Sequence, residues 1–318
     1  MTISALLTQA AGILAKSSPT PLLDADCLLS AVLHTDRARI LAHLDAPVPH
    51  RRADRFCALV ERRKKGLPVA YLTGHKEFFA LDFHVNPSVL IPKPDTETLV
   101  EKTLDFLAEV LILKPETLVE KTVSPTPLRV LDLCTGSLCV GIAVVRNAAG
   151  PVELTATDIS ESALRTAREN ARCLLSAEQR RLLHFVRADL FSGLGGRFDI
   201  IVSNPPYVPT KIAHALLADG RGEPLGALDG GEDGLALIRP LVSQAPKHLF
   251  PGGRLLIEIN HDQAEAVKKC FRLAGFEKIE VFKDLQGTPR VLCGLQGTSK
   301  NPGWVFRCAS HLHTANAV

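Results

Sequence analysis

The sequence lacks any long apolar run, since no stretch approaches the roughly 18–20 uninterrupted apolar residues that a membrane-spanning helix needs. The first 18 residues resemble a targeting segment but have no basic start and contain Thr8, Gln9 and Gly12, so they predict an amphipathic helix. The net charge is only +3, which gives no reason to expect a strongly basic nucleic-acid surface. We therefore expect a cytoplasmic monomer that binds neither a membrane nor, directly, a nucleic acid.

Cysteine pairs at redox or metal spacing are also missing. The eight cysteines include no Cys-x-x-Cys pair and no cluster with histidine at metal spacing. We expect most of them to be reduced core residues, because five lie in apolar helix or strand patterns, namely Cys27, Cys57, Cys173, Cys270 and Cys293. No metal site is expected.

The N-terminal part of the chain has the apolar periodicity of helices. Residues 22–34, 37–44 and 51–66 carry apolar residues at three- and four-residue spacing, and prolines separate them. This pattern predicts a small helical bundle over residues 1–70. Residues 71–92 change to an alternation of apolar and polar residues around Asp82, which predicts a connecting β-hairpin.

The rest of the chain alternates between strands and helices. Pro94 and Asp95 introduce a helix that runs to about Leu113, and Lys114–Leu128 has the composition of a surface linker. Seven short apolar runs follow, separated by helical segments, at residues 129–134, 154–158, 183–191, 198–204, 254–260, 276–282 and 290–295. They predict a doubly wound, mostly parallel α/β sheet of seven strands in a domain at residues 93–295. Residues 296–318 show no clear periodicity and are interpreted as a tail that can be disordered.

Three features are expected at the carboxyl ends of these strands, where open α/β sheets bind ligands. Gly136 lies in the turn after the first strand, Asp158 ends the next strand, and Asn204 follows the fourth. A carboxylate at the position of Asp158 can accept hydrogen bonds from ribose hydroxyls. A dinucleotide site needs a Gly-x-Gly-x-x-Gly loop, whereas here Gly136 alone occupies a glycine position. S-adenosylmethionine has no phosphate and demands less of the loop, so it is the favoured cofactor.

The tetrapeptide Asn204-Pro205-Pro206-Tyr207 directly follows an apolar strand. Two prolines remove two N–H donors, so the loop offers the Asn204 side-chain oxygen and the Pro205 carbonyl as acceptors. Together they can hold both hydrogens of a planar –NH₂ and aim its lone pair at an electrophilic methyl group. Tyr207 offers a flat face for stacking. The alternative is a Pro-Pro turn that only ends a strand.

Two acidic pairs have competing interpretations. Asp95 and Glu97 can form an acid/base pair, but carboxylates in the first turn of a helix are also favoured by its dipole, and we prefer that structural role. Glu232 and Asp233 are acidic enough for a metal, yet no matching ligands lie nearby in the sequence.

The chain resembles the family of protein-(glutamine) methyltransferases that modify peptide chain release factors, often called PrmC or HemK. The resemblance covers about residues 24–295. It is carried by the Asn-Pro-Pro-Tyr loop and, more specifically, by the blocks LIPKPDTE (90–97) and EPLGALDGGEDGL (223–235). It implies a class I, Rossmann-like methyltransferase domain whose N-terminal helical domain helps to dock the release factor. The implied reaction methylates the glutamine amide of the Gly-Gly-Gln loop and leaves S-adenosylhomocysteine as product.

The resemblance also implies roles for individual residues. The cofactor would contact the turn after the first strand, Asp158 at its ribose, Leu190 beside its adenine, and Asn204; the turn residues are Cys134, Thr135, Gly136, Ser137 and Leu138. Asn204, Pro205, Pro206 and Tyr207 would form the acceptor pocket, with Asn204, Pro205 and Tyr207 as the catalytic set.

Three departures from the family pattern stand in these segments. Cys134 and Leu138 replace the outer glycines of the family's D-L-G-T-G-S-G loop, and Lys93 stands where the family commonly has arginine. Leu138 would either crowd the methionine end of the cofactor or begin the helix with its side chain turned inward. Two other functions remain open: an adenine-amino methyltransferase that uses the same tetrapeptide on a flipped base, and a binding protein of this fold without cofactor affinity.

Overall fold

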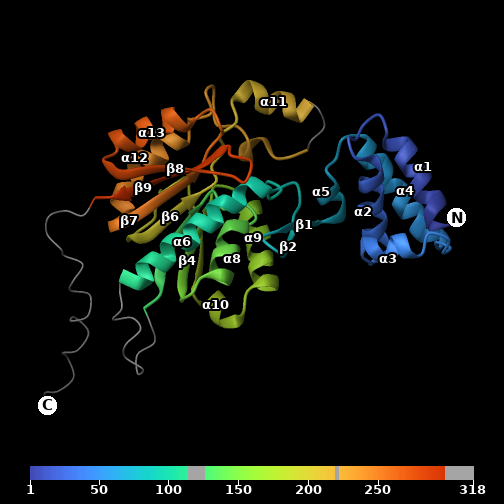
Figure 1. The fold of residues 1–318 in the computed structure, drawn as a ribbon, viewed down its shortest axis with the longest axis horizontal. Helices are drawn as coiled ribbons and strands as arrows, with labels where there is room; N and C mark the ends of the chain where they lie inside the picture. Colours follow the sequence, from blue (N-terminus) through green and yellow to red (C-terminus); the bar gives the residue numbers. More distant parts are fainter. Residues whose placement is uncertain (114–125, 219–221, 298–318) are drawn as a thin grey trace, which may run out of the picture.

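A helical bundle forms one end of the molecule in the computed structural model, which describes residues 1–113, 126–218 and 222–297 (Figure 1). Its elements are α1 (Ile3–Leu14), α2 (Pro21–Leu33), α3 (Arg37–Ala42), α4 (His50–Lys64) and α5 (Val69–Thr73). The helices enclose an apolar core of their own, in which Leu14, Leu28 and Phe56 are almost fully buried. Arg63 of α4 pairs with the buried Asp24 of α2 at 2.6 Å. The predicted bundle is confirmed.

The hairpin that follows consists of β1 (His75–Phe78) and β2 (Leu81–His84). The predicted hairpin is present, its turn is Phe79–Ala80, and Asp82 pairs with Glu77 next to that turn. Both turn residues have positive φ, as a two-residue turn of this kind requires, but neither is the glycine or asparagine that usually signals one. The Glu97 carboxylate accepts the Phe79 N–H at 3.2 Å and holds the turn.

The sheet has the strand order β5-β4-β3-β6-β7-β9-β8. Its strands are β3 (Leu128–Leu133), β4 (Val152–Asp158), β5 (Leu183–Arg187), β6 (Phe198–Ser203), β7 (Leu249–Glu258), β8 (Phe276–Lys283) and β9 (Pro289–Gln296). Only β9 opposes the common direction, since it pairs antiparallel with both β7 and β8. This is the predicted doubly wound, mostly parallel sheet. The strand order reverses between β3 and β6, so a ligand site is expected beyond their carboxyl ends.

Helices cover both faces of the sheet (Figure 1). One face packs against α6 (Glu97–Leu113), α8 (Cys139–Asn147) and α9 (Glu161–Leu174), and the other against α12 (Ile238–His248) and α13 (Ala264–Leu273). The remaining described elements are η1 (Pro94–Thr96), α10 (Ala177–Arg181), α11 (Thr210–Ala218) and η2 (Leu225–Ala227). Phe78 and Phe83 of the hairpin belong to the first of these two cores, so the hairpin is packed into the sheet domain.

Two sequence predictions fall largely on residues beyond those described. Of the segment Lys114–Leu128 the structure describes only residues 126–128, and of the tail only residues 296 and 297. Among the described helices none is long and apolar enough to cross a membrane. Within the same residues no group of three or more His, Cys, Asp or Glu side chains could hold a metal ion.

The prediction that most cysteines lie in the core is wrong for Cys57 and Cys173, which are exposed. Both lie on amphipathic helices, where a one-residue difference in phase moves a side chain from the core to the solvent. Cys293 is buried in β9 as expected, and Cys27 and Cys270 are half-buried.

A maleimide reagent is expected to modify Cys57 and Cys173 rapidly in the folded protein. Burial raises the pKa of the Cys293 thiol to about 12, so Cys293 should react roughly 100-fold or more slowly until the protein is unfolded, because the thiolate is the nucleophile. Mass spectrometry of tryptic peptides over a time course measures each site. Labelling of Cys293 as fast as Cys57 would contradict its placement in the core.

Candidate functional site at the strand ends

Four strands end at the same level on the carboxyl edge of the sheet. Leu133 of β3 pairs with Thr157 of β4 and with Ser203 of β6, and Ser203 pairs in turn with Ile257 of β7. The residues that come next, Cys134, Asp158, Asn204 and Glu258, therefore line one edge. The sequence predicted the first three at this edge and missed Glu258.

The turn after β3 is held from below by a buried carboxylate. Asp132 is only 2% exposed, and its Oδ2 accepts the Thr135 hydroxyl at 2.7 Å and the Gly141 N–H at 3.2 Å. Burial raises the pKa of Asp132 to about 7. Thr135 and Ser137 are themselves buried, so their side chains shape the turn. A Cβ on Gly136, whose φ is +54°, would meet nothing within 4 Å, which leaves space above this residue.

The two departures from the glycine pattern both occupy the left-handed region of backbone conformation. Cys134 has φ +58° and Leu138 has φ +66°, a conformation that costs a non-glycine residue roughly 1 kcal/mol or more. Leu138 is fully buried and belongs to the apolar core on the α8 side of the sheet. Of the two alternatives for this residue, the structure therefore has the one in which the side chain turns inward at the start of α8.

Asp158 is tied to both neighbouring loops. Its Oδ2 accepts the Gly136 N–H at 3.0 Å and its Oδ1 accepts the Ser160 N–H at 2.9 Å. The Ala188 N–H donates to the Asp158 carbonyl at 3.1 Å, which brings the loop containing Leu190 to the same end of the sheet. Burial raises the pKa of Asp158, although three backbone N–H groups oppose this rise. Each carboxylate oxygen retains lone-pair capacity for a ligand hydroxyl.

The Asn-Pro-Pro-Tyr loop follows β6 and is hydrogen bonded to two other segments of the chain. The Asn204 Nδ2 donates to the Thr96 hydroxyl oxygen at 3.2 Å, and the Tyr207 hydroxyl donates to Glu258 Oε1 at 3.0 Å. Pro205 and Pro206 are buried, whereas Asn204 and Tyr207 are half-buried. Asn204 and Tyr207, whose side chains can form hydrogen bonds, therefore remain partly exposed to solvent, while the two prolines between them are packed into the protein.

The block at residues 223–235 packs directly on this loop. The Val208 N–H donates to Leu228 and the Gly230 N–H donates back to Val208. Glycine is required at Gly230 and Gly234, because a Cβ on Gly230 would lie 2.8 Å from the Pro206 oxygen and one on Gly234 2.3 Å from the Tyr207 oxygen. The glycines of this block therefore allow backbone to lie on backbone around the tetrapeptide.

The other family-specific block, residues 90–97, is joined to the block at residues 223–235 by an ion pair. Lys93 Nζ lies 2.7 Å from Glu223 Oε1, which also accepts the Ile91 N–H at 3.3 Å. Lys93 thus pairs with a carboxylate through a single contact, where the arginine common in the family could make two. Asp95 pairs with Arg290 at 2.8 Å. Asp95 lies in the first turn of η1 and Glu97 in the first turn of α6, which is the structural role that the sequence favoured for both.

Glu258 is the functional candidate that sequence reasoning missed. It is 1% exposed, and burial raises its pKa to about 7, against the lowering effect of the hydrogen bond from Tyr207 and of the neighbouring Thr96. Its Oε2 has no hydrogen-bond partner among the described residues. The only signal in the sequence is a charged residue at the end of the apolar run RLLIEI, where a carboxylate is costly to bury without a purpose.

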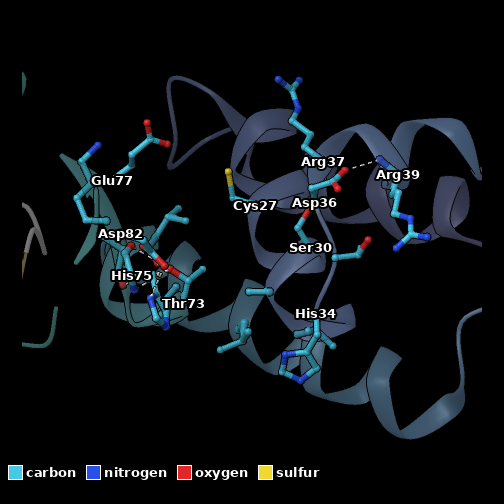
Figure 2. Close-up of a pocket in the computed structure, with 18 of the residues that line it drawn as sticks. Cys27, Ser30, His34, Asp36, Arg37, Arg39, Thr73, His75, Glu77 and Asp82 are labelled. Carbon is cyan, nitrogen blue, oxygen red and sulfur yellow. Dashed lines mark hydrogen bonds and ion pairs between the residues drawn. The ribbon is translucent and has the colours of Figure 1, made fainter. Parts of the chain in front are cut away.

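A separate cavity of about 1110 Å³ lies between the helical bundle and the hairpin (Figure 2). Helix residues such as Ser30, His34 and Arg37 line one side, and His75, Glu77 and Asp82 line the other. None of the residues predicted for the cofactor site or the acceptor site is among the described residues that line this cavity. This cavity is therefore distinct from the strand-end site.

Known protein families match both the helical bundle and the sheet domain. Residues 5–74 match the family model of the PrmC N-terminal domain, and residues 101–221 match that of the methyltransferase small domain. The release factor glutamine methyltransferase of Burkholderia pseudomallei (strain K96243) is 38% identical over 88% of this chain and 94% of its own length. That of Moorella thermoacetica is 40% identical over 85% and 89%.

This chain belongs to the release factor glutamine methyltransferase family. The resemblance inferred from the motif blocks is thereby confirmed, as is the prediction that the chain is a methyltransferase. The catalytic domain of hMettl16, in complex with MAT2A 3'UTR hairpin 6, is 15% identical with a TM-score of 0.51, and the match covers 78% of this chain and 82% of that one. At this identity the likeness shows the fold alone.

Proposed function

We propose that this enzyme transfers a methyl group from S-adenosylmethionine to the side-chain amide nitrogen of the glutamine in the Gly-Gly-Gln loop of peptide chain release factors. The observation that carries the proposal is the packing of both family-specific blocks around the Asn-Pro-Pro-Tyr loop. We further propose that the enzyme acts as a cytoplasmic monomer.

The residues of the chain fit the cofactor. Asp158 would bind the ribose, the open space above Gly136 leaves room for the cofactor to cross the turn, and Leu190 would lie beside the adenine. The shape of that turn is determined by Cys134, Thr135, Ser137 and Leu138. Bound S-adenosylmethionine supplies an electrophilic methyl group on a positively charged sulfur, and S-adenosylhomocysteine leaves as product.

The acceptor loop holds and orients the amide nitrogen. The Asn204 Oδ1 and the Pro205 carbonyl would each accept one N–H of the glutamine amide, while Tyr207 and Pro206 flank its plane. This grip directs the nitrogen toward the methyl group and stabilises the positive charge that develops on it. Positioning by Asn204, Pro205 and Tyr207 is therefore the main catalytic contribution that we assign to the protein.

We assign docking of the release factor to the N-terminal domain at residues 1–70, connected by residues 71–92 to the methyltransferase domain at residues 93–295. The cavity between bundle and hairpin (Figure 2) supports this assignment, because it is lined by charged side chains of both signs, among them Arg39 and Glu77 and also Arg55. Arg37 is paired with the buried Asp26. Arg55 is exposed and available to a partner.

Charge reversal at Arg55 is expected to raise the KM for the release factor by roughly threefold to tenfold and to leave kcat unchanged, because charges at an interface mainly affect association. Initial rates at a series of release factor concentrations measure both constants for Arg55→Glu. Arg51→Glu is the matched control, since Arg51 is an exposed residue of the same helix that is not among the residues lining the cavity. Equal KM values for the two variants would show that the cavity does not take part in docking the release factor.

The function is tested by incubating the enzyme with S-adenosylmethionine labelled in its methyl group and either a purified release factor or DNA. Label is expected on the release factor, at the glutamine of Gly-Gly-Gln by peptide mass spectrometry. A release factor with that glutamine replaced by alanine should remain unlabelled. Label in DNA alone would instead identify an adenine-amino methyltransferase. Absence of S-adenosylhomocysteine binding in calorimetry would exclude both enzymes.

A further inference from the structure

Tyr207, the last residue of the acceptor loop, is hydrogen bonded through both its side chain and its backbone. Its hydroxyl group donates to Glu258 Oε1 at 3.0 Å, and its carbonyl oxygen accepts a hydrogen bond from Gln263 Nε2 at 2.9 Å. Burial, together with the adjacent Glu258, raises the pKa of Tyr207, so its hydroxyl keeps its proton and is the donor. Both partners belong to residues 258–263, which join β7 to α13.

The orientation of the Gln263 amide is set by backbone groups that cannot exchange roles. Its Nε2 donates to the Tyr207 carbonyl and, at 3.4 Å, to the Gly234 carbonyl, and its Oε1 accepts the Asn260 N–H at 3.0 Å. A carbonyl only accepts and an N–H only donates, so a turned amide would lose all three bonds. Gln263 is 6% exposed. One buried side chain therefore joins the acceptor loop, the block at residues 223–235 and the turn after β7.

Glu258 costs the fold stability. The residue is 1% exposed, and its Oε2 has no hydrogen-bond partner among the described residues. The three residues before it in β7 are apolar and fully buried, namely Leu255, Leu256 and Ile257. A carboxyl group in such surroundings is less favourable than an apolar side chain of similar volume. A residue that breaks the local pattern at a cost in stability is expected where function requires it.

We propose that Glu258 and Gln263 are positioning residues that hold the ring of Tyr207 in place for the acceptor amide. Glu258 fixes the hydroxyl end of the ring, and Gln263 fixes the peptide group from which the ring projects. The two prolines before Tyr207 already restrict the loop, so these two bonds remove much of the freedom that remains. The proposal rests on the proposed function for the identity of the acceptor, and it adds residues outside the tetrapeptide to the machinery of the transfer.

A double-mutant cycle tests whether Glu258 acts through Tyr207. Tyr207→Phe keeps the flat ring without its hydroxyl group, and Glu258→Leu removes the acceptor of that hydroxyl. We expect each variant to lower kcat about 10- to 100-fold, because a ring that can move no longer holds the reacting geometry. The double variant should be no slower than the slower single variant, since both changes remove the same interaction. A further loss of kcat in the double variant would overturn the proposal.

Stability measurements on the same variants separate positioning from a role in the fold. The double variant should unfold at the same or a higher denaturant concentration than Tyr207→Phe alone, because a buried carboxyl group without its partner has been removed. Lower stability of the double variant would show that Glu258 serves the fold instead. Tyr71→Phe is the matched control for the loss of a hydroxyl group: the Tyr71 hydroxyl donates to the Val89 carbonyl at 2.6 Å, and kcat should be unchanged.

Gln263→Glu tests the backbone bond of Tyr207 at nearly constant volume. Whether ionised or not, a carboxyl group can donate to at most one of the two carbonyls that Nε2 contacts. We expect kcat to fall about 10- to 100-fold, while affinity for S-adenosylhomocysteine stays within about threefold of the wild type. Wild-type kcat in this variant would contradict the role of Gln263.

Gln179→Glu is the matched control for this exchange. Gln179 also donates to a backbone carbonyl, that of Val145 at 3.2 Å, and accepts a backbone N–H, that of Ser176 at 3.0 Å. It lies in α10, which directly precedes β5 and is therefore at the opposite edge of the sheet from the acceptor loop. Its kcat should match the wild type, and a loss equal to that of Gln263→Glu would overturn the proposal.

A readout without turnover separates this inference from the proposed function. Tyr71 and Tyr207 are the two tyrosines of the chain, so protein carrying tyrosine labelled with ¹³C at Cζ should give one resonance from each, assigned with the two phenylalanine variants. The Tyr207 resonance alone should shift in Glu258→Leu and in Gln263→Glu. An enzyme that labels no release factor but shows these shifts would refute the proposed acceptor alone. A Tyr207 resonance unchanged in both variants would refute the positioning role whatever the acceptor is.

Discussion

Asn204→Ala is expected to lower kcat for methyl transfer by about 100- to 1000-fold, the usual loss when one oriented group of a transition-state site is removed. The variant loses one of the two acceptors that hold the amide hydrogens, so the lone pair is no longer aimed. The fold should persist, because Asn204 is only half-buried and the bond to Thr96 is the one hydrogen bond of its side chain among the described residues.

Steady-state kinetics with a release factor, together with thermal unfolding, measure both effects. Asn147→Ala serves as the control, since the Asn147 side chain bonds only the Ala143 carbonyl of its own helix in the described structure and should leave kcat unchanged. Turnover of Asn204→Ala close to that of the wild type would refute the two-acceptor grip.

Leu138→Gly restores the glycine of the family pattern, yet it is expected to destabilise the protein by about 2–4 kcal/mol. Relief of the left-handed backbone contributes roughly 1 kcal/mol. Loss of a fully buried leucine costs about 3–5 kcal/mol because a cavity remains. Leu138 also fills the space beside Gly141, where its Cδ1 would lie 2.8 Å from an added Cβ. Affinity for S-adenosylhomocysteine should stay within about threefold of the wild type, since the leucine side chain faces the core.

Chemical denaturation and calorimetry of the same samples test this expectation. Cys134→Gly is the companion variant: Cys134 shares the positive φ but is only half-buried, so its free energy of unfolding should change by less than about 1 kcal/mol. Much tighter binding of S-adenosylhomocysteine by Leu138→Gly at unchanged stability would mean that Leu138 crowds the cofactor after all.

Much of the architecture could be read from local patterns. Apolar runs without alternation predicted buried parallel strands, and the positions of Gly136, Asp158 and Asn204 after such runs predicted a common edge. Periodicity was less informative where a shift of one residue along a helix moves a side chain from the core to the solvent, as for the exposed Cys57 and Cys173. It predicted the hairpin but not that its turn is Phe79–Ala80, because that turn is held by Glu97 from another element.

The Asn-Pro-Pro-Tyr loop shows where these limits lie in the site. The sequence by itself determined that a rigid loop rich in acceptors follows a buried strand, because proline geometry and strand patterning are local properties. Only the tertiary structure decided which way the Asn204 amide points, since Thr96 is 108 residues away from Asn204 and Glu258 is 51 residues from Tyr207. Glu258 comes next to the loop that contains Tyr207 because β6 and β7 pair in register, and register between strands follows from packing the whole sheet.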